Sequence, residues 1–98
     1  MPYITETDRK HVDEQVQELS NKLYVAGYKK GMLNYCITKL VLGYLKVYGK
    51  SYDTLSDIVG VLEDVKTEFQ RRVVNPYEDD KKFSNGDVYD VEIRFTNK

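Results

Sequence analysis

An inward-facing lysine is the first feature of this sequence that suggests chemistry. At about 100° per residue, Lys66 falls inside the apolar arc of the amphipathic segment 52–74, so its ammonium can face an anionic ligand. The simpler alternative is a local pair with Glu63, in which the lysine stem lies along the apolar surface. Lys66 is therefore a candidate ligand-binding residue.

Two adjacent arginines on the same segment extend the candidate anion site. Arg71 and Arg72 leave the helix in different directions, about 100° apart, so only one of them can serve a given site. Arg72 borders the apolar arc, where a planar guanidinium can receive a phosphate or stack on a base. A local ion pair between Arg72 and Glu68 is the simpler alternative.

Nine tyrosines and no tryptophan supply most of the aromatic surface. Tyrosine suits a covered surface that also needs a hydroxyl contact. Tyr35 and Leu42 share a lysine-bearing side of the segment 32–48, a mixture typical of an interface. Asn34 and Thr38 lie one turn apart there, and they either contact a ligand or bond the neighbouring backbone. The predicted ligand-binding residues are Asn34, Tyr35, Thr38, Lys66, Arg71, Arg72, Tyr77 and Tyr89.

Enzyme motifs are weak in this sequence, and we expect no catalytic residue, no metal site and no cofactor. All-helical, magnesium-dependent nucleotide pyrophosphatases use Glu-x-x-Glu and Glu-x-x-Asp pairs, whereas Glu14 and Glu18 are four residues apart. That activity is only a weak alternative. The single histidine and single cysteine make neither a metal cluster nor a nearby Cys–His pair. The acidic run within 76–82 lacks EF-hand spacing and is typical of a solvated loop.

Length and charge limit the class of protein. Ninety-eight residues correspond to a single domain, 1–98, and a net charge of -1 provides no field that attracts nucleic acid or an anionic membrane. Acidic residues at the start of segment 52–74 also disfavour sequence-specific DNA binding. We expect a cytoplasmic protein, because Cys36 has no disulfide partner and the chain lacks both an export signal and an apolar run of bilayer length.

The hydrophobic periodicity predicts a mostly helical α+β fold. Three helices are expected at about 8–25, 32–48 and 52–74, the last of them ending before Asn75-Pro76. Further along, the period changes to two, with Tyr89, Val91, Ile93 and Phe95 alternating with polar residues after an Asn85-Gly86 turn dipeptide. The expected architecture is a three-helix core with a C-terminal β-hairpin or strand at about 81–96.

That last strand needs a partner. Within the chain only Lys81–Ser84 is available, and it is short, so the strand either closes a small hairpin or pairs with an edge in another subunit. We favour association, and therefore a homo-oligomer.

Several phrases of the sequence resemble a known family. They are Leu33-Asn34-Tyr35, Ile37-Thr38, Gly60-Val61-Leu62-Glu63, Glu68-Phe69, Arg71-Arg72-Val73-Val74, Pro76-Tyr77-Glu78-Asp79 and Asn85-Gly86-Asp87-Val88-Tyr89. Together they resemble a family of short uncharacterised proteins, labelled a domain of unknown function, found mainly in bacteriophages and prophages. The resemblance spans roughly residues 1–89 and implies a phage-borne origin, but no activity, fold or catalytic residue. Gln70 stands where that family has an aromatic residue.

Two functions from different classes follow. The first is a non-enzymatic, phage-type homo-oligomer that binds and sequesters an anionic nucleotide, for instance a cyclic nucleotide signal of host anti-phage defence. Its tyrosines would stack on bases, and Lys66, Arg71 or Arg72 would meet phosphates. The alternative is a protein-interaction module that binds a host or virion protein through the Tyr35–Leu42 face or the alternating tail.

Overall fold

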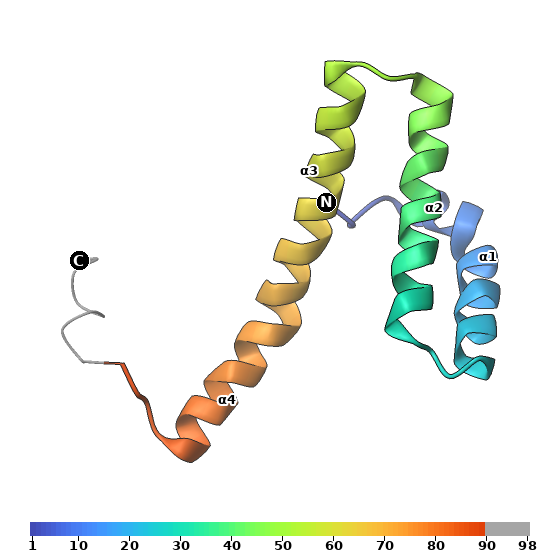
Figure 1. Cartoon of the computed structure of the whole chain (residues 1–98). Coiled ribbons are helices and arrows are strands. Elements are labelled where there is room, and N and C mark those ends of the chain that lie inside the picture. The colour runs from blue at the N-terminus through green and yellow to red at the C-terminus, as the bar shows by residue number, and fades with distance from the viewer. Residues whose placement is uncertain (90–98) are drawn as a thin grey trace. The chain divides into compact units, whose positions relative to one another are not determined.

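The computed structural model describes residues 1–89, and its regular elements there are all helical (Figure 1). They are α1 (Glu6–Val25), α2 (Lys30–Tyr48), α3 (Tyr52–Phe69), the π-helix η1 (Gln70–Val74) and α4 (Asn75–Asn85). The chain divides into two compact units, Met1–Val65 and Lys66–Lys98. Unit 1 holds α1, α2 and most of α3, whereas unit 2 holds the end of α3, η1 and α4.

The α+β expectation is wrong, because the described part of the chain is all-α. Lys81–Ser84, expected to be a strand, lies within α4. Asn85-Gly86 is the end of that helix rather than a hairpin turn: Gly86 has φ 97° and its N–H donates to Lys82 O at 2.9 Å. The alternating residues of segment 90–98 lie outside the described residues.

The expected stop at Asn75-Pro76 is also wrong, and the reason is the position of the proline. Pro76 lies in the first turn of α4, directly after the wider turn of the π-helix η1, and a proline is tolerated at that position. Val74 and Asn75 both have right-handed helical backbone angles. The helical conformation therefore continues from η1 into α4.

Local contacts define the turn between α1 and α2. Thr5 caps the start of α1 by accepting a hydrogen bond from Asp8 N–H at 3.2 Å. At the other end Gly27 (φ 93°) and Tyr28 (φ 48°) both have left-handed backbone angles. The Tyr28 N–H donates to Leu23 O at 2.6 Å, and its hydroxyl lies 3.0 Å from Ser20 Oγ. These contacts reverse the chain without burying a large apolar surface.

A tighter turn joins α2 and α3, which lie side by side as a helical hairpin (Figure 1). Gly49 (φ 84°) ends α2, and its N–H donates to Leu45 O at 2.8 Å. Ser51 Oγ accepts from Thr54 N–H at 3.2 Å and donates to Thr54 Oγ1 at 3.1 Å. Thr54 is buried by this arrangement.

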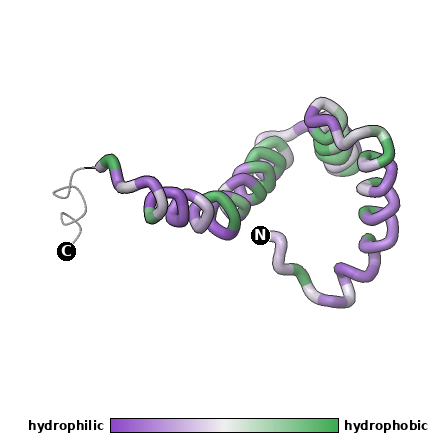
Figure 2. Tube along the Cα trace, turned by 90° about the horizontal axis from the view of Figure 1, so that it is seen from below, coloured by the Kyte–Doolittle hydropathy of each residue, from purple (hydrophilic) through white to green (hydrophobic). Residues whose placement is uncertain are grey.

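Unit 1 has almost no apolar core of its own. Leu23 is buried at 5% exposure, whereas α2 contains no buried residue. Figure 2 shows apolar residues concentrated in α2 and α3, while α1 and α4 are mostly hydrophilic. The apolar faces of α2 and α3 are thus largely open to solvent.

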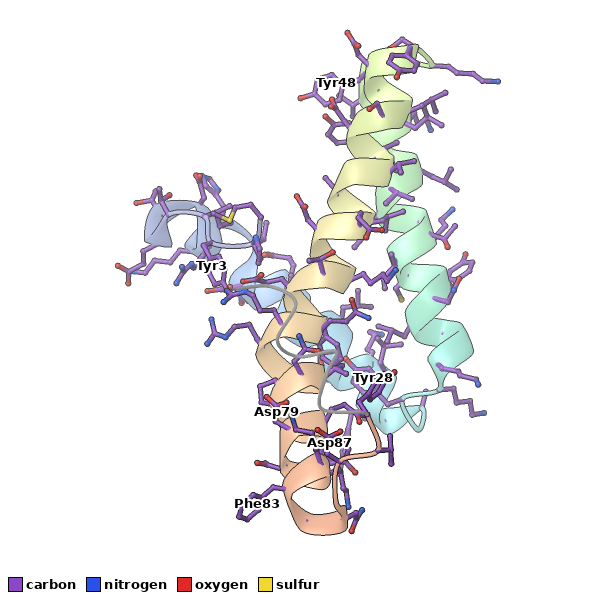
Figure 3. The ribbon with its side chains drawn as sticks, turned by 90° about the vertical axis from the view of Figure 1, so that its left-hand side faces the viewer. Tyr3, Tyr28, Tyr48, Asp79, Phe83 and Asp87 are labelled. Atoms are coloured by element: carbon purple, nitrogen blue, oxygen red, sulfur yellow. The ribbon has the colours of Figure 1, made fainter. Side chains whose placement is uncertain are left out.

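Unit 2 is polar and contains its own local contacts. Glu68 and Arg71 form an ion pair at 2.6 Å, and Lys81 Nζ lies 5.6 Å from the centre of the Tyr77 ring. Phe83 projects outward from α4 and is 92% exposed (Figure 3). In neither unit does a described helix combine the length and apolarity needed to cross a bilayer.

Leu23→Ala is expected to lower the free energy of unfolding by about 2–4 kcal/mol, because it removes the one buried apolar side chain among the described residues. Urea denaturation at one fixed protein concentration measures the change. Val25→Ala, on the same helix at an exposed position, is the matched control and should change stability by no more than about 0.5 kcal/mol. Equal losses in the two variants would show that Leu23 is not the packing centre of unit 1.

Candidate functional site

An apolar groove lies between α2 and α3 in unit 1. It has a volume of about 200 Å³ and its surface is almost wholly apolar. Its lining comes from both helices: Leu40, Val41 and Tyr44 of α2, and Ile58 and Val61 of α3. Val41 and Ile58 are half-buried, whereas Leu40 is 69% exposed. The groove can therefore accept apolar side chains.

A tyrosine–aspartate contact links the two helices beside this groove. The Tyr44 hydroxyl donates to Asp57 Oδ2 at 3.2 Å, and the Tyr44 ring packs on Tyr48 with ring centroids 4.7 Å apart. Partial desolvation raises the pKa of the Tyr44 phenol, and the negative charge and hydrogen bond of Asp57 raise it further. The phenol is thus held in its neutral, donating form beside the carboxylate.

The predicted residues on α2 lie on its exposed surface. The Thr38 hydroxyl donates to Asn34 Oδ1 at 3.3 Å, so these two side chains bond each other rather than the neighbouring backbone. Tyr35 is 63% exposed, and Leu42 is exposed as well. This part of α2 therefore offers a mixed aromatic and aliphatic surface.

Glu68 forms an ion pair with Arg71. Arg71 Nε and Nη2 donate to the two oxygens of Glu68 at 3.2 and 2.6 Å, a bidentate geometry. From the sequence, the pair considered for Glu68 was the i, i+4 pair with Arg72; the ion pair seen here is the i, i+3 pair with Arg71. Lys66 and Arg72 are both exposed. One of the three predicted anion-binding cations is thus occupied by a carboxylate.

The remaining predicted residues, Tyr77 and Tyr89, lie at α4 and just after it. Tyr89 borders a hollow of about 380 Å³ at the C-terminal end of α4. Acidic residues outnumber lysines in its lining, which consists of Glu78, Asp79, Lys81, Lys82, Asn85, Gly86, Asp87, Val88 and Tyr89. Asp87 Oδ1 also accepts from the Tyr89 N–H at 3.0 Å. The charges of this hollow disfavour an anionic ligand.

The eight predicted residues are divided between the units: Asn34, Tyr35 and Thr38 belong to unit 1, and Lys66, Arg71, Arg72, Tyr77 and Tyr89 to unit 2. Three of them contact side chains three or four residues away on the same helical stretch: Thr38 contacts Asn34, Arg71 contacts Glu68, and Tyr77 lies under Lys81. The described residues also hold no group of three or more histidine, cysteine, aspartate or glutamate side chains arranged to bind a metal ion.

Sequence reasoning did not single out the groove. The expectation was that the apolar residues of segments 32–48 and 52–74, which include Leu40, Val41 and Ile58, would pack into a three-helix core. A stripe of that kind does not reveal whether its partner is in the same chain. The available signal was that apolar residues cover well over half of the α2 circumference, more than one neighbouring helix can cover.

Comparison with known proteins identifies a family but no activity. The family model described as "Domain of unknown function (DUF6899)" matches residues 1–88. No curated protein and no solved structure matches the chain.

Asp57→Asn should lower the pKa of Tyr44 toward the ordinary tyrosine value of about 10, because it removes the carboxylate that opposes phenolate formation. Tyrosine ring carbon signals followed by NMR through an alkaline titration give this pKa. Asp53→Asn, which removes an acid from the same helix, is the matched control and should leave Tyr44 unchanged.

The raised pKa of Tyr44 also determines how the stability of the fold changes at alkaline pH. Folding favours the protonated Tyr44 phenol, so this residue stabilises the folded state below about pH 10, the pKa of an ordinary tyrosine. The contribution is lost as the pH rises through the raised pKa of Tyr44. Asp57→Asn should weaken this alkaline loss of stability. A Tyr44 titration identical in the wild type and in Asp57→Asn would contradict the assigned contact.

Proposed function

The chain belongs to the DUF6899 family, and since that family description names no activity, we propose a function from the surface of the chain itself. The protein is a non-enzymatic, self-associating helical module that binds other proteins. The observation that carries the proposal is the exposure of the apolar faces of α2 and α3.

The magnitude of this exposure argues for a partner. A domain of this size normally buries about 60–65% of its unfolded surface. In unit 1, however, Leu40 and Val47 are 69% and 76% exposed, although both lie within α2. Covering such side chains stabilises a complex by about 25 cal/mol per Å² of apolar surface. Association with a protein surface is the most direct way to gain that energy.

The Tyr35–Leu42 face is the proposed surface for a partner other than a second copy. Tyrosine is enriched in protein interfaces, because its ring supplies contact area and its hydroxyl supplies a hydrogen bond. The phage-borne origin implied by the sequence resemblance makes a host or virion protein the expected partner, encountered in the host cytoplasm. The alternating tail, the other surface considered from the sequence, lies outside the described residues.

Sequestering an anionic nucleotide, such as a cyclic signal of host defence, is the competing function. It receives less support, because Arg71 is paired with Glu68 and the hollow near Tyr89 is lined by more acids than lysines. Each arrangement lowers the affinity expected for phosphate. The two functions predict different bound masses.

Native mass spectrometry of the full chain, alone and then with a panel of linear and cyclic nucleotides, distinguishes them. We expect a discrete oligomer whose mass is unchanged by every nucleotide at near-physiological salt. An oligomer that gains one nucleotide per subunit or per symmetric pair would establish the sequestering function instead.

A protein that remains monomeric from micromolar to submillimolar concentration would contradict self-association and with it the proposed function. As a matched pair, Leu42→Lys tests the Tyr35–Leu42 face and Val25→Lys tests an exposed apolar residue on α1. Leu42→Lys should weaken the binding of a host or virion protein, whereas Val25→Lys should leave that binding unchanged.

A further inference from the structure

We propose that Asn85 is a site of spontaneous deamidation, and that the C-terminal end of α4 controls the rate of the reaction. The inference is independent of the proposed function, because it uses neither the α2–α3 groove nor the association of chains. Asn85 is the last residue of α4, Gly86 follows it, and both residues are exposed to water. The reaction converts a neutral amide into a carboxylate and so adds one negative charge to the chain.

The chemistry needs only these two residues and water. The backbone nitrogen of Gly86 attacks the side-chain amide carbon of Asn85 and forms a new C–N bond. The side-chain nitrogen leaves as ammonia, taking the proton that the Gly86 nitrogen loses, and a cyclic imide remains. Water then adds to either carbonyl carbon of the imide and breaks one C–N bond, which gives aspartate or isoaspartate. The balance is one water consumed and one ammonia released.

Gly86 suits the attacking role because it has no side chain. No atom lies within 4 Å of the position that its Cβ would occupy, so this position is open space. The approach of the Gly86 nitrogen to the Asn85 side chain is therefore free of the steric hindrance that a larger residue would bring. The φ of 97° at Gly86 is one that residues with a side chain rarely adopt. The residue that ends α4 is thus also the one that hinders the reaction least.

A helical hydrogen bond controls when the nitrogen reacts. The Gly86 N–H donates to Lys82 O at 2.9 Å, which holds this nitrogen toward the preceding turn. The bond closes the C-terminal end of α4, and helix ends fray at a low cost in free energy. Fraying frees the Gly86 nitrogen and lets Asn85 leave its helical backbone angles. We therefore expect the rate of deamidation to follow the stability of the last turn.

The three other asparagines among residues 1–89 lack this combination. Asn75 precedes Pro76, which has no N–H with which to attack. Asn21 and Asn34 lie inside α1 and α2, and each is followed by a residue with a large side chain. Their side-chain oxygens accept hydrogen bonds at 2.9 and 3.3 Å from residues four positions away. The structure therefore distinguishes Asn85 from each of them.

The new charge is unfavourable where it forms. The carbonyl groups at the C-terminal end of a helix carry partial negative charge, which repels a carboxylate at position 85. Glu78, Asp79 and Asp87 line the same hollow as Asn85 and add to the repulsion; Asp79 and Asp87 are labelled in Figure 3. Isoaspartate also lengthens the backbone by one methylene group, which displaces the Gly86 N–H from its acceptor. Deamidation should therefore open the end of α4.

The test follows the full chain during incubation at neutral pH and physiological temperature. Peptide mapping by tandem mass spectrometry, sampled over several weeks, locates each asparagine that gains the mass difference between OH and NH2. We expect Asn85 to convert at least about 10-fold faster than Asn21 or Asn34, because a helix end opens far more often than a helix interior. Isoaspartate should be among the products, since only the imide route forms it.

Two sets of variants complete the design. Asn85→Gln should stay unmodified over the same period, because its longer side chain closes the corresponding ring much more slowly. Ser84→Gly and Ser84→Ala are a matched pair at an exposed position of the last turn. Asn85 should convert about 2- to 5-fold faster in Ser84→Gly than in Ser84→Ala, since glycine weakens a helix and alanine stabilises it. Hydrogen exchange at the Gly86 N–H should follow the same order.

Each outcome bears on one part of the proposal. An Asn85 that converts no faster than Asn21 and Asn34 would overturn the assigned site. Equal rates in the two Ser84 variants would overturn control by the helix end, and aspartate without isoaspartate would overturn attack by the Gly86 nitrogen. Selective conversion of Asn85 to both products, faster in Ser84→Gly, supports the proposal.

Discussion

The constraint on which the rest of the structure depends is that unit 1 does not enclose its own apolar surface. Short turns connect α1, α2 and α3, and each turn is built from backbone hydrogen bonds and small caps rather than from packed side chains. Leu23 is the buried apolar residue of this part of the chain. Under the proposed function, the apolar energy that stabilises a domain of this size comes largely from contacts outside the single chain.

The uncovered apolar surface of unit 1 includes the groove between α2 and α3, and the Tyr44–Asp57 contact lies beside this groove. Tyr44 joins α2 to α3 through Asp57 and holds the hairpin together at one position, while Leu40 and Val61 stay exposed on the two walls. Under the proposed function, these exposed apolar walls are surface that a partner covers.

Periodicity and glycine placement were enough to expect helical segments near those of the structure, because local propensity and turn chemistry determine them. The same reasoning failed where one dipeptide has two uses. Asn85-Gly86 suits a hairpin turn and also a helix end, and the helix before it decided the outcome.

Pro76 was read as a stop although a proline is compatible with a first helical turn. The pairing of Glu68 with Arg71 was missed because Arg71 and Arg72 are both within reach of Glu68 on a helix. The groove was missed because a stripe of apolar residues does not specify which chain covers it.

The most direct test of the central claim is the concentration dependence of thermal unfolding, followed by circular dichroism at 222 nm. If the apolar faces of α2 and α3 are covered by another copy, unfolding is coupled to dissociation, and the midpoint should rise steadily over a 100-fold increase in protein concentration, about 5 to 500 μM. A cooperative transition with the same midpoint throughout that range would contradict the account. It would mean that the single chain stabilises its helices without a partner.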